Sequence, residues 1–322
     1  MEYFQFGSLA VSRVCLGTWV WAGIDSEASL RTIRHALDLG INLIDTAPLY
    51  GNGLAEEILG KALVAHGRRD QVFVATKVGV EWTDSTSFRN SSPARIQQEI
   101  EDSLRRLRTD YIDLYQVHWP DPHVPIEETA GALLKILQSG KVRFLGVSNY
   151  SPRQMDAFQK LAPLAAIQPP YNIFEREAER EVLPYARQRG LVILAYGAIC
   201  RGLLSGRMTA STTLAADDYR QLDPKFKPPR FSQYLAAAQA LEKLARKKHG
   251  KSLLALAVRW LLDRGTVPIW GARTSSQLDS VNDAFGWQLS PADMKTVDAI
   301  VAETVLDPVG PEFMAQPERA SQ

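Results

Sequence analysis

Cysteines are scarce in this chain, which has only Cys15 and Cys200 among its 322 residues. Two cysteines are too few for a disulfide framework and are compatible with a reducing compartment. Long apolar runs are also lacking, since the longest, LVILAYGAIC at 191–200, is too short to cross a bilayer. The first residues, MEYFQF, lack the basic start of a secretory signal. We therefore predict a soluble, cytoplasmic protein that does not bind membranes.

Neither sign of charge is in excess, because 37 Lys and Arg residues stand against 36 Asp and Glu residues, for a formal net charge of +1. Such a chain has no global field that would attract nucleic acid, so a small neutral or locally anionic ligand fits better. Low-complexity tracts, charge blocks and linkers are absent as well. These absences predict one domain over residues 1–322, within the size range of α/β barrels, and we expect a monomer.

Short apolar segments alternate with amphipathic segments along most of the chain, which is typical of βαβ units in a parallel sheet. Eight such units favour a closed α/β barrel of the (β/α)8, or TIM, type. EYFQFG and LAVSR are expected to pair as an N-terminal hairpin that closes one end of the barrel. The eight predicted strands lie in VCLGT, INLIDTA, VFVATK, YIDLYQVH, VRFLGVS, AAIQ, LVILAY and TVPIW.

Helix and loop signals fit the same architecture. Ser92 is a candidate N-cap, Pro93 suits the first helical position, and apolar residues between 96 and 107 trace one face. Residues 201–230 predict a long loop after the seventh strand, which could cover a site. The tail DPVGPEFMA is expected to be extended and to fold back. Extra C-terminal helices are predicted near 232–248, near 251–264 and after Ser290-Pro291.

Four polar residues lie at or near the ends of consecutive predicted strands, namely Asp45, Tyr50, Lys77 and His118. The C-terminal ends of barrel strands converge on one rim, so these side chains are expected to meet. A tyrosine is a poor acid at neutral pH, and an adjacent ammonium lowers its pKa. Asp45 would hold Lys77 charged, while His118 would orient a carbonyl oxygen. Each residue alone fits a packing or capping role, but their ordered recurrence predicts a proton-delivery site.

The segments LIDTAPLYGNG, TDYIDLYQVHWPD, LGVSNY and AYGAICRGLLSG occur in this order, and through them the chain resembles the aldo-keto reductases. The segments YQVHWPDP, IQPPYNIFERE and DPVGPEFMA are similar to the bacterial family 11 branch, which includes stress-associated and glyceraldehyde reductases. The resemblance implies hydride transfer from a nicotinamide cofactor to small aldehydes or ketones such as glyceraldehyde or methylglyoxal. Tyr50 would be the general acid, NADPH is the expected cofactor, and NADH is possible.

The resemblance also implies where the cofactor and substrate lie. Ser148, Asn149 and Gln168 would hold the carboxamide, and Tyr196 would stack on the nicotinamide ring. Arg273 would bind the adenosine 2′-phosphate, although Gly271-Ala272 replaces the Lys-Ser pair of many relatives. The full expected cofactor set is Thr18, Trp19, Asp45, Ser148, Asn149, Gln168, Tyr196, Gly197, Ala198, Cys200, Arg201 near the pyrophosphate, Gly202, Arg207, Gly271, Arg273, Gln277 and Asn282. The expected walls of the substrate pocket, for which ordinary rim packing is the alternative, are Trp19, Trp21 and Trp119.

Two other local signals are discounted. GNGLAE at 51–56 is an incomplete G-x-G-x-x-G loop, because Glu56 occupies the final glycine position. Glu56 and Glu57 instead predict a solvated helix start. His118, Asp121 and His123 do not match a closed zinc motif, so we expect no metal.

Two other functions stay open at this point. Some barrels of this family serve as cofactor-binding regulatory subunits with slow or no turnover, and a fold alone does not settle function. Lys77 could also be a Schiff-base nucleophile in an aldolase-like barrel, a role that requires a neutral amine. Asp45 opposes the second role because a carboxylate favours the protonated amine.

Overall fold

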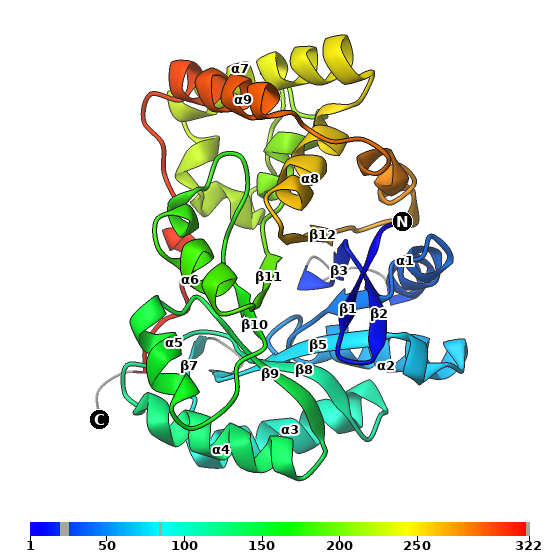
Figure 1. The fold of residues 1–322 in the computed structure, drawn as a ribbon, viewed down its shortest axis with the longest axis vertical. Helices are drawn as coiled ribbons and strands as arrows, with labels where there is room; N and C mark the ends of the chain where they lie inside the picture. Colours follow the sequence, from blue (N-terminus) through cyan, green and yellow to red (C-terminus); the bar gives the residue numbers. More distant parts are fainter. Residues whose placement is uncertain (20–25, 84–85, 320–322) are drawn as a thin grey trace.

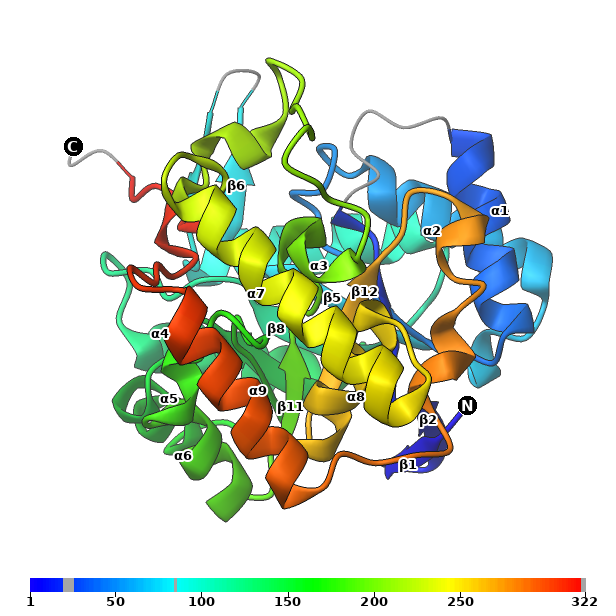
Figure 2. The ribbon, with the colours of Figure 1, turned by 90° about the horizontal axis from the view of Figure 1, so that it is seen from above.

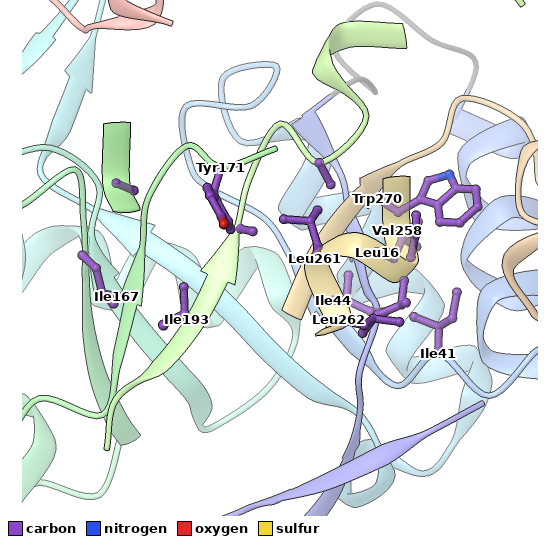
Figure 3. Packing of buried hydrophobic residues seen from close by; sticks show 14 of the residues in the cluster. Leu16, Ile41, Ile44, Ile167, Tyr171, Ile193, Val258, Leu261, Leu262 and Trp270 are labelled. Carbon is purple, nitrogen blue, oxygen red and sulfur yellow. The ribbon is translucent and has the colours of Figure 1, made fainter. Parts of the chain in front are cut away.

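Successive residues of the short barrel strands face two different buried layers. In the computed structural model, which describes residues 1–19, 26–83 and 86–319, Leu43 lies in the apolar cluster inside the barrel. The next residue, Ile44, lies in the larger cluster between the strands and the surrounding helices, part of which is shown in Figure 3. Cys15 and Leu16 alternate in the same way. Because the side chains on both faces of each strand are buried, the strand sequences are continuous apolar runs.

Within the described residues, eight parallel strands form a closed barrel (Figure 1). The last strand pairs with the first through Ile269 and Cys15, which closes the sheet. The predicted (β/α)8 fold is confirmed, and each of these strands extends at most one residue beyond its predicted segment. In their order around the barrel the strands are β3 (Cys15–Gly17), β4 (Leu43–Asp45), β5 (Phe73–Val78), β8 (Ile112–Val117), β9 (Val142–Ser148), β10 (Ala166–Gln168), β11 (Val192–Ala195) and β12 (Val267–Gly271).

Helices surround the barrel, and the predicted C-terminal helices are confirmed. Two of them, α7 and α9, lie side by side on the outside of the molecule (Figures 1 and 2). A π-helical turn, Ala245–His249, extends α7. The α-helices are α1 (Ser26–Asp38), α2 (Leu54–His66), α3 (Pro93–Leu107), α4 (Ile126–Gln138), α5 (Pro152–Gln159), α6 (Val182–Gln188), α7 (Arg230–Leu244), α8 (Leu253–Asp263) and α9 (Pro291–Thr304).

An N-terminal hairpin closes the end of the barrel where the strands begin, as predicted. Its strands β1 (Tyr3–Phe6) and β2 (Leu9–Ser12) pair antiparallel. Phe6 stacks on Phe73, the first residue of β5, with ring centroids 4.7 Å apart. Gly7 turns the hairpin with a φ of 62°, and a Cβ there would lie only 2.5 Å from the ring of Phe144. The hairpin therefore leaves the opposite rim as the open end.

The start of α3 confirms the capping signals. The Ser92 hydroxyl accepts a hydrogen bond from the peptide N–H of Arg95, and Pro93 occupies the first turn. The apolar face from Ile96 to Leu107 is buried. Because the cap satisfies a peptide donor that has no partner within the helix, it defines where the helix begins.

The start of α2 differs from the prediction, because Glu56 is fully buried rather than solvated. One carboxylate oxygen accepts a hydrogen bond from the Thr76 hydroxyl (2.6 Å), and the other accepts from Nε of Arg106 (2.7 Å). Arg106 lies on α3, 50 residues along the chain, so no local signal reveals the pair. The first turn of α2 is thus bound to both β5 and α3.

Gly60 permits the close approach of α2 and α3. A Cβ at this position would lie 2.3 Å from the backbone oxygen of Arg106, a contact that only a helix shift can relieve. We expect Gly60→Ala to lower the free energy of unfolding by about 1–3 kcal/mol. Gly131→Ala in α4 is the matched control, because nothing lies within 4 Å of its Cβ; it should raise stability by about 0.5–1 kcal/mol. Urea unfolding of both variants checks this, and equal effects would contradict the packing argument.

Two long irregular segments lie at the open rim. Residues 201–230 follow β11 as predicted and contain only short helical turns, η4 (Cys200–Ser205), η5 (Tyr219–Leu222) and η6 (Pro224–Phe226). The C-terminal tail folds back, as predicted, and contains the turn η10 (Glu312–Met314). In the part of the chain that the structure describes, no helix combines the length and apolar character needed to span a bilayer.

Candidate active site

A cavity of about 550 Å³ opens at the rim where the barrel strands end. The side chains at its base come from strand ends, because Asp45 is the last residue of β4 and His118 directly follows β8. The structure therefore brings together residues from Gly17 to Gln316, which lie 299 positions apart in the sequence. Of the predicted site residues, the following line the cavity: Trp19, Asp45, Tyr50, His118, Trp119, Ser148, Asn149, Gln168, Tyr196, Gly197, Ala198, Arg201, Gly202, Gly271, Arg273 and Gln277.

Lys77 lies directly behind this lining and joins two of its members. Its Nζ donates to a carboxylate oxygen of Asp45 at 2.6 Å and to the hydroxyl of Tyr50 at 3.1 Å. A third bond, to the backbone oxygen of Thr46 at 2.9 Å, uses its remaining donor. Lys77 is fully buried and Asp45 is 3% exposed. With all three of its protons placed, the ammonium has a defined position beneath the tyrosine hydroxyl.

Two side-chain amides also bind the Asp45 carboxylate, at the oxygen that does not contact Lys77. That oxygen accepts hydrogen bonds from the side chains of Gln168 (2.8 Å) and Gln116 (3.4 Å). Gln116 lies on β8 and was not among the predicted site residues, since a glutamine within an apolar strand gives no distinctive signal. The two amides orient the carboxylate toward Lys77.

Electrostatics keep the ammonium charged. Burial alone would lower the pKa of Lys77, but Asp45 and Tyr50 outweigh burial and raise that pKa above its ordinary value. A Schiff-base nucleophile needs a neutral amine. The environment of Lys77 therefore disfavours the aldolase-like alternative.

The pKa of Tyr50 is raised, although the ammonium of Lys77 was expected to lower it. Burial raises the pKa of the Tyr50 phenol, and the Lys77 ammonium lowers it but does not fully compensate. The net pKa of Tyr50 therefore lies above its ordinary value. Lys77 acts in the predicted direction, but the sequence could not reveal how deeply the phenol is buried.

His118 lies beside Tyr50 with its ring centroid 5.8 Å away and its plane nearly perpendicular. Burial, together with the Lys77 charge, holds the pKa of His118 well below its ordinary value. The imidazole is therefore neutral at physiological pH and offers one N–H donor. A neutral donor suits hydrogen bonding to a carbonyl oxygen rather than delivery of the proton.

The residues predicted to hold a carboxamide form one polar group at the ends of β9, β10 and β11. The Ser148 hydroxyl donates to the backbone oxygen of Gln168 (2.7 Å), and the Tyr196 hydroxyl donates to the side-chain oxygen of Asn149 (3.0 Å). Asn149 has a φ of 61°, and its amide nitrogen donates to the backbone oxygen of His118 (3.1 Å). This bond links the group to the Tyr50 side of the cavity.

The predicted arginines lie in different environments. Arg201 lines the cavity but is buried, and it forms ion pairs with Glu175 and with Asp223, the latter at 2.7 Å. Arg273 is exposed and forms no ion pair with any residue that the structure describes. Its backbone N–H is bound by the side chain of Gln277 (2.7 Å). Because Arg273 forms no ion pair among the described residues, its guanidinium is better placed than that of Arg201 for an added anion.

Some predicted residues lie elsewhere. Among the described residues, the cavity lining does not include Thr18 and Cys200, which are buried behind it, or Arg207 and Asn282, which are exposed. Thr18 instead donates to the hydroxyl of Thr46 at 2.9 Å. Trp21 lies outside the described residues. The role of each of these residues remains a prediction.

Two parts of the lining were not predicted residue by residue. Tyr219, Arg220 and Leu222 come from the loop after β11, and residues 313–316 come from the C-terminal tail. The ring of Tyr219 meets that of Trp19 edge to face at 4.5 Å. The sequence indicated that both segments approach the rim, but neither has a periodic pattern that identifies its inward-facing residues.

Asp121, which belongs to the His118, Asp121 and His123 pattern that matches no zinc motif, binds backbone N–H groups. The Asp121 carboxylate accepts hydrogen bonds from the backbone N–H groups of Ser91 (3.0 Å) and His123 (2.9 Å). Across residues 1–19, 26–83 and 86–319, no three His, Cys, Asp or Glu side chains come together as potential metal ligands. Asp121 therefore organises the backbone at the end of β8.

Comparisons with known proteins show the family of this chain. Residues 13–302 match the model of the aldo/keto reductase family. The chain is 52% identical to aldo-keto reductase YhdN of Bacillus subtilis, over 99% of both chains. It is 32% identical to aldo-keto reductase yakc [NADP(+)] of Schizosaccharomyces pombe, over 89% of this chain and 87% of that one. With the NADH-specific methylglyoxal reductase of Escherichia coli it shares 38% identity over 62% of this chain and 68% of that one.

Among solved structures, the glycerol dehydrogenase AKR11B4 from Gluconobacter oxydans superimposes with a TM-score of 0.89 at 52% identity. The match covers 96% of this chain and 97% of that one. The predicted resemblance to family 11 is confirmed by this neighbour.

Proposed function

The chain belongs to the aldo/keto reductase family of oxidoreductases, and on this premise we propose that it reduces small neutral aldehydes and ketones at the Tyr50 rim. The observation that carries the proposal is the hydrogen bond from the buried Lys77 ammonium to the Tyr50 hydroxyl at the base of the cavity. A phenol that is exposed to a cavity on one side and bound to an ammonium on the other is suited to deliver a proton to a developing alkoxide.

Each residue of the group has a separate task in this proposal. Tyr50 donates the proton, and Lys77 stabilises the phenolate that remains. Asp45, bound to Lys77 at 2.6 Å, keeps that ammonium charged and in place. The neutral His118 donates a hydrogen bond to the substrate oxygen, which places the carbonyl beside the Tyr50 hydroxyl.

The same rim fits a nicotinamide cofactor, which supplies the hydride when bound. The polar group of Ser148, Asn149 and Gln168 offers donors and acceptors for a carboxamide, and the ring of Tyr196 lies in the cavity wall beside it. Arg273, which is exposed and forms no ion pair with a described residue, suits a 2′-phosphate, because a guanidinium binds phosphate with two parallel hydrogen bonds. We therefore favour NADPH, and NADH is the alternative, since the names of the relatives include both cofactors.

The apolar part of the cavity lining favours small neutral substrates. It includes Trp19, Leu49, Trp119 and Phe313, which carry no charge. An apolar pocket with a few polar groups at its base binds the body of a small carbonyl compound and orients its oxygen. Glyceraldehyde and methylglyoxal are the substrates we propose first, in keeping with the glycerol dehydrogenase and methylglyoxal reductase among the related proteins.

The decisive experiment measures NADPH consumption by the purified protein with a panel of small aldehydes, beside NADH and beside Tyr50→Phe. We expect oxidation of NADPH that depends on both aldehyde and Tyr50. Tight NADPH binding without turnover on any aldehyde would instead support the role of a cofactor-binding regulatory subunit.

Replacement of Arg273 tests the cofactor preference. We expect Arg273→Ala to raise the Kd of NADPH about 10-fold or more and to leave that of NADH within about twofold, because only NADPH offers a phosphate to the guanidinium. Quenching of protein fluorescence by each cofactor measures both constants. Arg180→Ala is the matched control, since Arg180 is exposed, lies outside the cavity lining and is not in the expected cofactor set. Equal weakening of NADPH and NADH would contradict a 2′-phosphate site at Arg273.

A further inference from the structure

Four buried charged residues form a cluster beneath one wall of the cavity. Glu175 follows β10, Arg201 follows β11, and Asp223 and Lys225 lie near the end of the long loop. The Lys225 ammonium is 2.8 Å from Glu175 and 3.5 Å from Asp223, and Arg201 pairs with the same two carboxylates. Burial alone would raise the pKa of the Glu175 carboxyl. Arg201 and Lys225 outweigh burial and hold that pKa below its ordinary value. Two positive and two negative charges therefore balance.

Lys225 also reaches the C-terminal tail. Its Nζ donates to the backbone oxygen of Gly310 at 2.8 Å, although 85 residues separate the two. The side chain is fully buried, so this bond has little competition from water. Lys225 therefore joins three segments, which are the loop after β10, the loop after β11 and the tail.

The tail forms part of the cavity wall directly after this contact. Residues 313–316 line the cavity, and their far end is bound to the β6–β7 hairpin (Val80–Trp82 and Ser87–Arg89). There Nε of Arg89 donates to the backbone oxygen of Gln316 (2.8 Å), and its backbone N–H donates to that of Pro317 (2.9 Å). Lys225 thus holds the wall at its start and Arg89 holds it at its far end, while the Arg201 guanidinium lies 5.4 Å over the ring of Phe313 between them.

We propose that Lys225 is a positioning residue that sets the tail wall of the substrate pocket and thereby limits the size of the accepted carbonyl compound. The proposal rests on the proposed reductase function. Lys225 does not line the cavity among the described residues, so it acts through the tail and not through the substrate. Without its ammonium, the start of the wall loses its bond at Gly310 and keeps the contacts of Arg201 and Arg89 further along, so the segment that follows Gly310 gains freedom.

Lys225→Met tests this role while keeping the length of the apolar stem. We expect the KM for glyceraldehyde to rise about tenfold, in line with loss of a hydrogen bond from a charged group. The KM for a bulky aromatic aldehyde should rise less, so that discrimination by size decreases. The value of kcat and the Kd of NADPH should stay within about twofold, because Tyr50, Lys77 and Arg273 are untouched.

Two further variants separate the tail contact from the charge balance. Lys225→Met combined with Asp223→Asn leaves Arg201 and Glu175 as a neutral pair but does not restore the bond to Gly310. Arg230→Met is the matched control, because Arg230 binds Asp307 of the same tail at a more exposed position, before the Gly310 contact. We expect the double variant to behave like Lys225→Met and Arg230→Met to behave like the wild type.

Hydrogen exchange of the tail gives a readout that does not need turnover. Peptides covering residues 309–319 should exchange faster in Lys225→Met and in the double variant than in the wild type or Arg230→Met. An unchanged KM in folded Lys225→Met, or a normal KM in the double variant, would overturn the proposal. If the wild type reduces no aldehyde, the proposed function fails, whereas tail exchange still decides whether Lys225 holds the wall.

Discussion

Replacing Tyr50 with phenylalanine is expected to lower kcat for aldehyde reduction by about 10²- to 10⁴-fold, the usual contribution of a positioned general acid. The ring, which packs edge to face with His118, is retained, so only the proton donor is removed. The Kd of NADPH should change by less than about twofold. Single-turnover oxidation of bound NADPH on mixing with aldehyde measures the chemical step directly.

The matched control for this variant is Tyr185→Phe. It removes a tyrosine hydroxyl that binds Asp156 and Gln159 on α5, outside the cavity lining. We expect its kcat to equal that of the wild type. Turnover of Tyr50→Phe at the wild-type rate would exclude Tyr50 as the acid and would require another donor at the rim.

The pH dependence of the wild type gives a further check on the same assignment. Reduction needs protonated Tyr50, so kcat is lost only as pH rises through the pKa of that phenol, which burial raises. The pKa of His118 lies well below its ordinary value, so the imidazole stays neutral and contributes no change near pH 6.5. We expect kcat to be flat from about pH 6.5 to about pH 9. A loss of activity centred near pH 6.5 would contradict a neutral His118.

The second large effect is expected for Lys77→Met, which should impair both stability and turnover. Removal of the ammonium leaves the Asp45 carboxylate buried without its ion-pair partner. Breaking a buried pair in this way costs about 3–5 kcal/mol of unfolding free energy. The Tyr50 phenol also loses the charge that opposes burial, so its pKa rises further and it becomes a weaker acid. Urea unfolding and single-turnover rates measure the two effects.

A double variant separates these effects. In Lys77→Met combined with Asp45→Asn, the uncompensated charge is gone, so we expect much of the lost stability to return. The rate should remain low, because no ammonium faces the phenol. Recovery of the wild-type rate in the double variant would show that Lys77 serves only to compensate Asp45.

Much of the architecture was predictable because its signals are local. Buried parallel strands read as short apolar runs, and polar residues such as Asp45 and Lys77 stand out where these runs end. The Ser92 cap and the turn at Gly7 likewise depend on neighbouring residues alone. Since parallel strands in a barrel end at the same rim, the order of these residues along the chain predicts that they meet.

Other features were not predictable, because they depend on contacts between distant residues. Glu56 resembles a solvated first-turn glutamate until Arg106 and Thr76 enclose it. Arg201 suits a phosphate by its chemistry, but the fold brings Glu175 and Asp223 against it. The inward-facing residues of the long loop and of the tail follow no period, so only the folded chain reveals them.

The sequence by itself determined the barrel, the hairpin at its closed end, the rim with the candidate site and the meeting of Asp45, Tyr50, Lys77 and His118 there. Periodicity, capping and strand order suffice for these features, since each is expressed over a few residues or repeated along the chain. The tertiary structure decided the electrostatic balance at Tyr50, the pairing of the buried charges and the shape of the substrate wall. These properties depend on burial and on distances between side chains, which are set only when segments far apart in the sequence pack together.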